Sequence, residues 1–215
     1  MIRYSVGLSL SPASPIESGA AVMELETGRL VYMDKLFSMN DIQMFFDNYT
    51  PLKSSVVCVS LPWDNTMLEG KWRVLSKQYQ QMNIGRCTFL NRDNWMQRFS
   101  SRGSELFLNL KNAGVDISRF EVYLARQKLN LYSNFKERSS ADCKFFQSAL
   151  KFEYGFWEMP VNMLPVAQLE AITGAILGRE KCRGNTSEIF KFHNLSVINR
   201  KGEVKPNSRE CRADR

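Results

Sequence analysis

The chain has 215 residues, of which 44% are hydrophobic and 24% are charged. This size and composition suit one folded domain with a sizeable core, and they exclude global disorder. No run of roughly 18 apolar residues occurs, so we expect no membrane-spanning helix. The first residues, MIRYSVGLSLSP, mix apolar and polar side chains and therefore predict a strand rather than a secretory signal.

Cysteine and histidine usage narrows the chemistry. The five cysteines are scattered and include no C-x-x-C pair, which indicates neither a disulfide framework nor a zinc ribbon. We therefore expect reduced thiols in a cytoplasmic or another reducing internal compartment. His193 is the single histidine, so no metal site can be built on a histidine pair. A nucleophilic triad of Ser60, His193 and Asp64 is disfavoured because the G-x-S-x-G turn is absent.

The first part of the chain predicts three consecutive antiparallel strands. Residues 2–10 form an apolar run that is typical of a buried strand. Residues 18–37 alternate between apolar and polar side chains in two runs, separated by the turn dipeptide Thr27-Gly28.

A helix and a further strand are predicted next. Ser38 is suited to cap a helix over residues 39–49, in which apolar side chains recur at helical spacing. Residues 54–62, SSVVCVSLP, are short, rich in valine and followed by a turn residue. They predict a buried strand that runs parallel to the first one.

The remainder of the chain predicts helices that alternate with strands. Apolar stripes at helical spacing predict helices over residues 66–82, 94–114, 140–155 and 165–180. FEVYLARQ, residues 120–127, predicts another strand, and two short runs near the C-terminus predict a hairpin around residues 199–202. This order of elements predicts a single α/β domain with a mixed sheet.

Three short motifs, in this order, resemble the family of predicted RNase H-like nucleases. VGLSLSP with the hairpin after it resembles the first strand of that family, VVCVSLPW resembles its second strand motif, and LEAITGAILG resembles its last helix. The resemblance implies an RNase H-like sheet, with three antiparallel strands followed by parallel ones, flanked by helices. It places this domain in residues 1–180 and leaves 181–215 as a basic C-terminal hairpin and tail.

The resemblance also indicates which catalytic groups are missing. In such nucleases carboxylates from two strands and the last helix hold two divalent cations that cleave a phosphodiester. Ser9 and Ser60 stand where the family has aspartates, and Leu124 falls near the position of a further acid of the family. At the position of the family's acid on the last helix, this chain also has an acid, Glu170. A neutral hydroxyl cannot replace a carboxylate as a ligand of Mg²⁺. The chain is therefore predicted to be catalytically degenerate, with no metal or cofactor.

Two alternatives remain open. Acids elsewhere in the chain, namely Asp64, Glu69 and Glu17, could rebuild a Mg²⁺-dependent nuclease site together with Glu170. In a different α/β fold, Ser9 and Ser60 would only form hydrogen bonds at the ends of their strands.

Basic residues indicate the partner. The net charge is +7, and the ten bases and five acids of residues 179–215 supply +5 of it. A segment of this kind attracts phosphates. The candidate nucleic-acid contacts are Lys71, Trp72, Arg73, Lys77, Arg179, Lys181 and Arg183. The bases of residues 71–77 and those of residues 179–183 are both expected at the edge of the sheet where the strands that end in Ser9 and Ser60 finish. The competing interpretation makes Trp72 and Trp95 core side chains and leaves the bases in solvent.

The sequence thus predicts a degenerate RNase H-like protein that acts as a nucleic-acid-binding or assembly module. Its expected partner is nucleic acid or a ribonucleoprotein, and no membrane is expected. An active nuclease with rearranged carboxylates and a structural subunit of a larger complex are the alternatives, so the sequence leaves open whether the protein is an enzyme.

Overall fold

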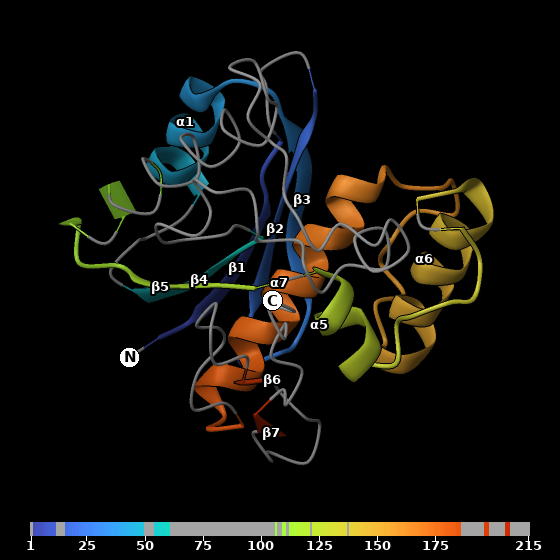
Figure 1. The fold of residues 1–215 in the computed structure, drawn as a ribbon. Coiled ribbons are helices and arrows are strands. Elements are labelled where there is room, and N and C mark those ends of the chain that lie inside the picture. Colours follow the sequence, from blue (N-terminus) through green and yellow to red (C-terminus); the bar gives the residue numbers. More distant parts are fainter. Residues whose placement is uncertain are drawn as a thin grey trace, which may run out of the picture.

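The fold is a mixed β-sheet with helices on both of its faces (Figure 1). A computed structural model of the protein describes residues 2–11, 16–49, 54–60, 106, 109–110, 112–120, 122–136, 138–185, 196–197 and 205–206.

The main sheet of the described chain contains five strands: β1 (Tyr4–Ser9), β2 (Ser18–Glu24), β3 (Leu30–Leu36), β4 (Ser55–Val59) and β5 (Asp116–Arg119). Their order across the sheet is β3-β2-β1-β4-β5. β1, β2 and β3 pair antiparallel, whereas β1 with β4 and β4 with β5 pair parallel. This order and these directions are those of the RNase H-like fold, so the predicted fold class is confirmed.

Helix α1 (Met39–Tyr49) covers one face of the sheet. It begins as predicted, because the Asp41 amide donates to Ser38 Oγ at 3.0 Å and the Ser38 amide donates to Asp41 Oδ2 at 2.8 Å. This reciprocal cap satisfies backbone donors that the first turn leaves without helical partners. Phe45 and Phe46 then pack on the apolar side chains that β1, β2 and β4 present to this face.

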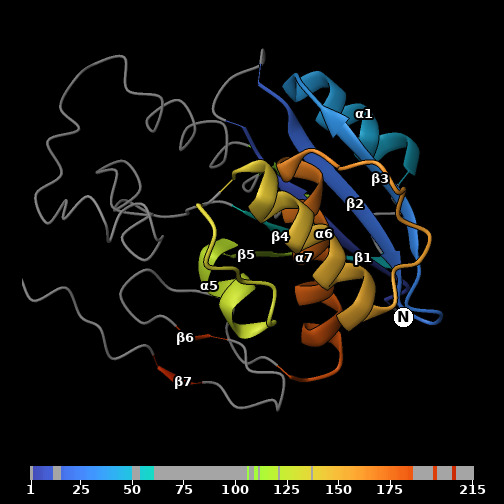
Figure 2. The ribbon, with the colours of Figure 1, turned by 90° about the vertical axis from the view of Figure 1, so that its right-hand side faces the viewer.

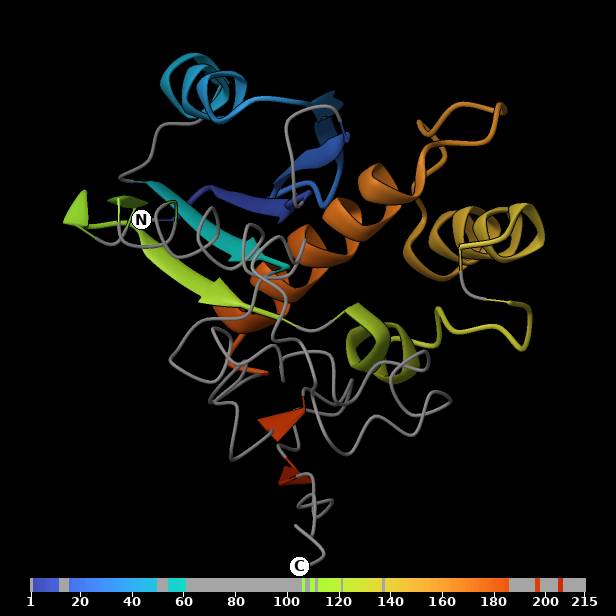
Figure 3. The same cartoon turned by 45° about the horizontal axis from the view of Figure 1, so that its top comes forward.

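The other face carries the helices that build the candidate site. α7 (Val166–Cys182) lies directly on the sheet. α6 (Ser140–Tyr154) packs on the side of α7 that faces away from the strands (Figures 2 and 3). Phe146 and Leu150 of α6 are fully buried in the core that includes α7. α5 (Val122–Lys128) completes this layer.

Close contact between α7 and β1 depends on small residues. A Cβ atom added to Gly7 would lie 1.8 Å from the carbonyl oxygen of Ala171, so no larger residue fits there without moving the helix. Beside it, Ser5 Oγ donates to the carbonyl of Ala175 at 2.6 Å. The glycine therefore sets the height of α7 above the sheet and, with it, the position of the acid that α7 carries.

One predicted element is wrong. The described residues between 120 and 127 form no strand, because the strand β5 ends at Arg119 and α5 begins at Val122. Ala125 and Leu129 are buried and Val122 is partly buried, which is the spacing of a helix that turns one side to the core. Leu124 therefore lies in a helix and does not supply a strand position for a metal ligand.

Other predictions further along the chain have clear outcomes. The helices predicted over residues 140–155 and 165–180 are confirmed as α6 and α7. β6 (Ser196–Val197) and β7 (Lys205–Pro206) pair antiparallel on either side of residues 199–202, around which the C-terminal hairpin is predicted, and the turn itself lies outside the described residues. The helix predicted over 66–82 lies outside the described residues, as does most of the one over 94–114. Among the described helices, none has the length and apolar character that crossing a membrane requires.

Candidate functional site

Two serines stand side by side at one edge of the sheet. Ser9 is the last residue of β1, and Ser60 directly follows β4. The two strands are parallel with Leu8 opposite Val59, and the Ser60 amide continues the ladder by donating to the Leu8 carbonyl at 2.8 Å. Both serines are buried. The carboxyl ends of β1 and β4 thus bring two hydroxyl side chains to the place where the resemblance put a pair of aspartates.

Glu170 faces this edge from α7. Ser9 Oγ donates to Glu170 Oε2 at 2.7 Å, and Arg138 Nη2 donates to Glu170 Oε1 at 2.8 Å. Glu170 is only 3% exposed, so these donors compensate much of the cost of burying its carboxylate. The structure thus joins the first strand to the last helix through Ser9 and Glu170, and Arg138 supplies the positive charge at this point.

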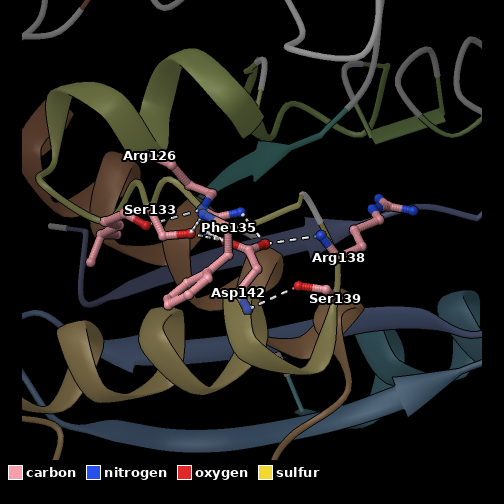
Figure 4. A network of polar contacts seen from close by, with 7 residues as sticks. Arg126, Ser133, Phe135, Arg138, Ser139 and Asp142 are labelled. Atoms are coloured by element: carbon pink, nitrogen blue, oxygen red, sulfur yellow. Dashed lines mark hydrogen bonds and ion pairs between the residues drawn. The ribbon is translucent and has the colours of Figure 1, made fainter.

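Arg138 belongs to the loop between α5 and α6, and Figure 4 shows how Asp142 binds this loop. We call residues 131–136 and 138 of this loop the strap. Asp142, in the first turn of α6, is its anchor: Asp142 Oδ1 accepts from Ser133 Oγ at 2.6 Å, and Oδ2 accepts from the Arg138 amide at 2.9 Å. Arg138 has a φ of 63°, a left-handed backbone conformation that is unfavourable for a residue with a side chain. The anchor holds the strap in this conformation and aims Arg138 at Glu170.

Asp142 is itself held by a buried arginine. Arg126 Nη2 and Nη1 donate to the two Asp142 oxygens at 2.7 and 3.1 Å, and Arg126 Nε donates to the carbonyl of Leu131 at 3.1 Å. The guanidinium lies 4.0 Å from the ring centre of Phe146. Burial acts to raise the pKa of Asp142, but the hydrogen bonds from Arg126, Ser133 and the Arg138 amide outweigh burial and hold this pKa below its usual value. The carboxylate therefore stays charged at neutral pH.

The described residues of the site do not by themselves supply the ligands that a pair of divalent metal ions requires. Its donors among the described residues are one carboxylate and two hydroxyls, with a guanidinium already bound to the carboxylate. Divalent metals in hydrolytic sites of this kind require several anionic oxygen ligands. In the described part of the chain, no group of three or more histidine, cysteine, aspartate or glutamate side chains is arranged to hold a metal ion.

One buried polar atom of α7 has no hydrogen-bond partner in the described part of the chain. Gln168 lies two residues before Glu170 on α7 and is 6% exposed. Its Oε1 is the single buried side-chain oxygen or nitrogen of the described residues that has no hydrogen-bond partner. Such an unsatisfied buried group lowers the stability of a folded protein.

The predicted bases of α7 lie at the other end of the helix. The first turn of α7 lies near the Ser9 end of β1, because Ala167 contacts Gly19, the partner of Ser9 on β2. The last turns of α7 lie at the opposite end of β1, because Gly178 contacts Ser5. Nine residues separate Glu170 from Arg179, which corresponds to about 14 Å along a helix. The expectation that these bases share the sheet edge of the serines is therefore wrong.

These bases are also engaged within the protein. Arg179 and Arg183 both form ion pairs with Glu180, at 3.3 and 3.4 Å. Lys181 forms an ion pair with Asp116 on β5 and donates to Ser118 Oγ. Burial lowers the pKa of Arg179, whose guanidinium also lies over the Tyr154 ring. These contacts attach the end of α7 to β5 and α6, and a role in nucleic-acid binding remains a prediction.

The other predicted residues have separate outcomes. Glu17, one of the relocated acids, forms an ion pair with Lys35 on the edge strand β3, at 3.9 Å. The remaining predicted acids and bases, and two aromatic side chains named with them, lie outside the described residues: Asp64, Glu69, Lys71, Trp72, Arg73, Lys77 and Trp95.

The strap was missed by the sequence analysis. Ser139 and Asp142 form a recognisable cap at the start of α6, and this signal was readable. The pairing of Arg138 with Glu170 was not readable, because the two residues are 32 positions apart and no motif connects them.

Comparison with known proteins gives a distant likeness in fold. The sequence matches no protein-family model and no curated protein. A structure titled T. thermophilus RuvC in complex with Holliday junction substrate aligns with a TM-score of 0.48 and 11% identity, over 84% of this chain and 96% of that one. A Thermus thermophilus RuvC structure aligns with the same TM-score and identity, over 94% and 99% of the two chains. The RNase H-like fold of this chain rests on its own strand order and directions.

Proposed function

We propose that this protein binds nucleic acid through an RNase H-like scaffold and does not cleave it by metal-dependent chemistry. The observation that carries the proposal is the contact of Arg138 and Ser9 with Glu170. Glu170, the acid that the described chain places at the ends of the central strands, is bound by the protein's own guanidinium and hydroxyl.

Electrostatics explains why this contact opposes metal catalysis. A two-metal site places about four positive charges among several carboxylates, which both neutralise and position the ions. Here a single carboxylate already has a guanidinium at 2.8 Å. A divalent ion that bound Glu170 would have to displace Arg138 or approach a fixed positive charge.

Nucleic-acid binding does not need the metal ligands. Contacts that position a phosphate backbone use basic side chains, hydroxyls and backbone amides. The chain carries a net charge of +7, most of it in its C-terminal part. We further propose the division into a domain of residues 1–180 and a basic tail of residues 181–215 that adds electrostatic attraction.

The first test is a cleavage assay. The purified protein is expected to leave RNA, DNA and hybrid duplexes intact in the presence of Mg²⁺ or Mn²⁺, as measured with end-labelled substrates on denaturing gels. The same preparation should bind labelled oligonucleotide equally well with EDTA. Cleavage that disappears in Asp64→Asn or Glu170→Gln would establish an active nuclease with rearranged carboxylates instead.

A second test uses salt. Affinity is expected to fall steeply with salt concentration, with a log–log slope of about −0.7 to −0.9 for each phosphate contact. Replacing Arg179, Lys181 and Arg183 together by alanine should flatten the slope by about one contact, because only Arg183 has a side chain more than half exposed. Absence of salt-dependent binding by the unaltered protein would indicate a structural subunit that docks onto other proteins.

A further inference from the structure

Exposed apolar side chains gather on α6 and on the connection from α6 to α7. Within the described chain, half of the ten large hydrophobic residues that are exposed come from this stretch: Phe145, Phe152, Trp157, Val161 and Met163. Phe152 is 72% exposed and Trp157 is 65% exposed, which are unusual values for aromatic side chains. Concentration of such residues on one surface indicates a binding site.

The outer face of α6 has a regular pattern. The pair Lys144-Phe145 is repeated seven residues later as Lys151-Phe152. Seven residues make about two helical turns, so both pairs lie on the same side of the helix, about 10 Å apart. The opposite side of the helix is buried against the core. The repeat therefore places two lysines along one flank of two exposed aromatic rings.

The chain after α6 extends this surface with a third ring. Gly155 ends the helix in a left-handed conformation, with φ of 71°, and the chain turns back. Trp157 then meets Phe152 edge to face, with 5.4 Å between ring centres and 87° between ring planes. The neighbouring Phe156 and Met159 are buried and fix this turn to the core. The Phe152–Trp157 pair is thus held on a rigid support.

Hydrogen bonds also fix the rest of the connection. Gln147 Nε2 donates to the carbonyls of Pro160 and Asn162 at 2.8 and 3.0 Å, and Lys151 Nζ donates to Pro160 at 3.0 Å. These bonds secure the loop along α6, so the surface does not have to be ordered when a ligand binds.

The charge of this face is complementary to phosphate. In the part of the chain that the structure describes, Lys144 has no ion-pair partner, unlike the three bases at the end of α7. Glu153, the exposed acid of the helix, projects about 100° away from Phe152, and Asp142 is bound to Arg126. Lys144 is therefore available to an external anion, and Lys151 keeps its positive charge while its Nζ donates to the Pro160 carbonyl.

We propose that this surface, formed by Lys144, Phe145, Lys151, Phe152 and Trp157, binds single-stranded nucleic acid. The proposal rests on the function proposed above. Bases stack on Phe152 and Trp157, and phosphates contact the lysine flank. Exposed aromatic rings stack on unpaired bases, which a duplex does not present. Aromatic rings are also common in protein interfaces, but lysine is depleted there, so the two lysines favour a partner that carries phosphates.

The test compares variants of the full chain for binding to a fluorescent oligothymidine of about 20 nucleotides, in EDTA and by anisotropy. Phe152→Ala together with Trp157→Ala should weaken binding at least about tenfold, since the stacking of bases on aromatic rings supplies a large part of such affinities. Phe37→Ala, which removes an exposed phenylalanine between β3 and α1, is the matched control and should leave affinity unchanged. Lys144→Gln should flatten the salt slope by about one contact.

The outcomes separate this surface from the proposed function. Unchanged affinity of the double variant, with binding by the unaltered protein intact, would overturn the α6 surface and keep nucleic-acid binding. Equal weakening for a duplex of the same length would also overturn the stacking role. The double variant could instead lose a protein complex, seen as a lower mass in light scattering, and keep its oligothymidine binding. That result would assign the surface to a protein partner. Circular dichroism should show that the double variant unfolds at the same temperature as the unaltered protein, because both rings are exposed.

Discussion

Replacing Gly7 by alanine is expected to destabilise the protein by about 3 kcal/mol or more, the upper end of the range for overpacked cores. The new methyl group would lie 1.8 Å from the Ala171 oxygen and 2.4 Å from the Ala175 nitrogen, both backbone atoms of α7. A side chain could rotate away, but a helix backbone must shift as a whole. Urea unfolding followed by circular dichroism gives the change in the free energy of unfolding.

A second glycine separates this clash from other effects of glycine. Gly114 has φ of 77° and no heavy atom within 4 Å of an added Cβ atom. Gly114→Ala should therefore cost only the roughly 1–2 kcal/mol of placing a side chain in a left-handed conformation. An equal or smaller loss for Gly7→Ala than for Gly114→Ala would contradict the close contact between α7 and β1.

Much of the fold was predictable because its signals are local. The alternating runs around Gly28 gave β2 and β3, and Ser38 marked the start of α1. The strand predicted over residues 120–127 was wrong because a short run with apolar side chains at every second position also fits one side of a helix. The choice between strand and helix there is made by the core, where Ala125 and Leu129 are buried.

The candidate site was only partly predictable, for geometric reasons. Ser9 and Glu170 could be named from motifs, because a strand end and a helix face are readable in a sequence. Arg138 could not, since its direction depends on the left-handed backbone of the strap and on its anchor, Asp142. The separation of Arg179 from Glu170 could have been predicted, because the nine-residue step between these positions spans about 14 Å along a helix.

The second large effect is expected at the anchor of the strap. Asp142→Ala should cost about 3–5 kcal/mol, because it leaves the Arg126 guanidinium buried without a counter-charge. Both side chains are nearly inaccessible, at 4% and 2% exposure. The variant also removes the acceptor for Ser133 and the Arg138 amide, so the strap loses the contacts that aim Arg138 at Glu170. Thermal and urea unfolding measure the loss.

The pH dependence of stability provides an independent measurement. The pKa of Asp142 is lower in the folded protein than its usual value near 4, so its charged form stabilises the fold above about pH 4. That contribution is lost as the pH falls through the lower, folded pKa. The free energy of unfolding of the unaltered protein should therefore decrease on acidification below about pH 4, and this decrease should be smaller in Asp142→Ala.

A double variant tests whether the pair matters through its charge. Arg126→Met combined with Asp142→Leu removes both charges and fills the space with apolar groups, and such replacements of buried pairs are often neutral or stabilising. We expect the double variant to regain most of the stability that Asp142→Ala loses, while Arg138 still lacks its anchor. A loss below about 1 kcal/mol for Asp142→Ala, as for a surface ion pair, would contradict the buried anchor. A double variant as unstable as the single one would show that the shape of the strap, rather than the unpaired charge, determines stability here.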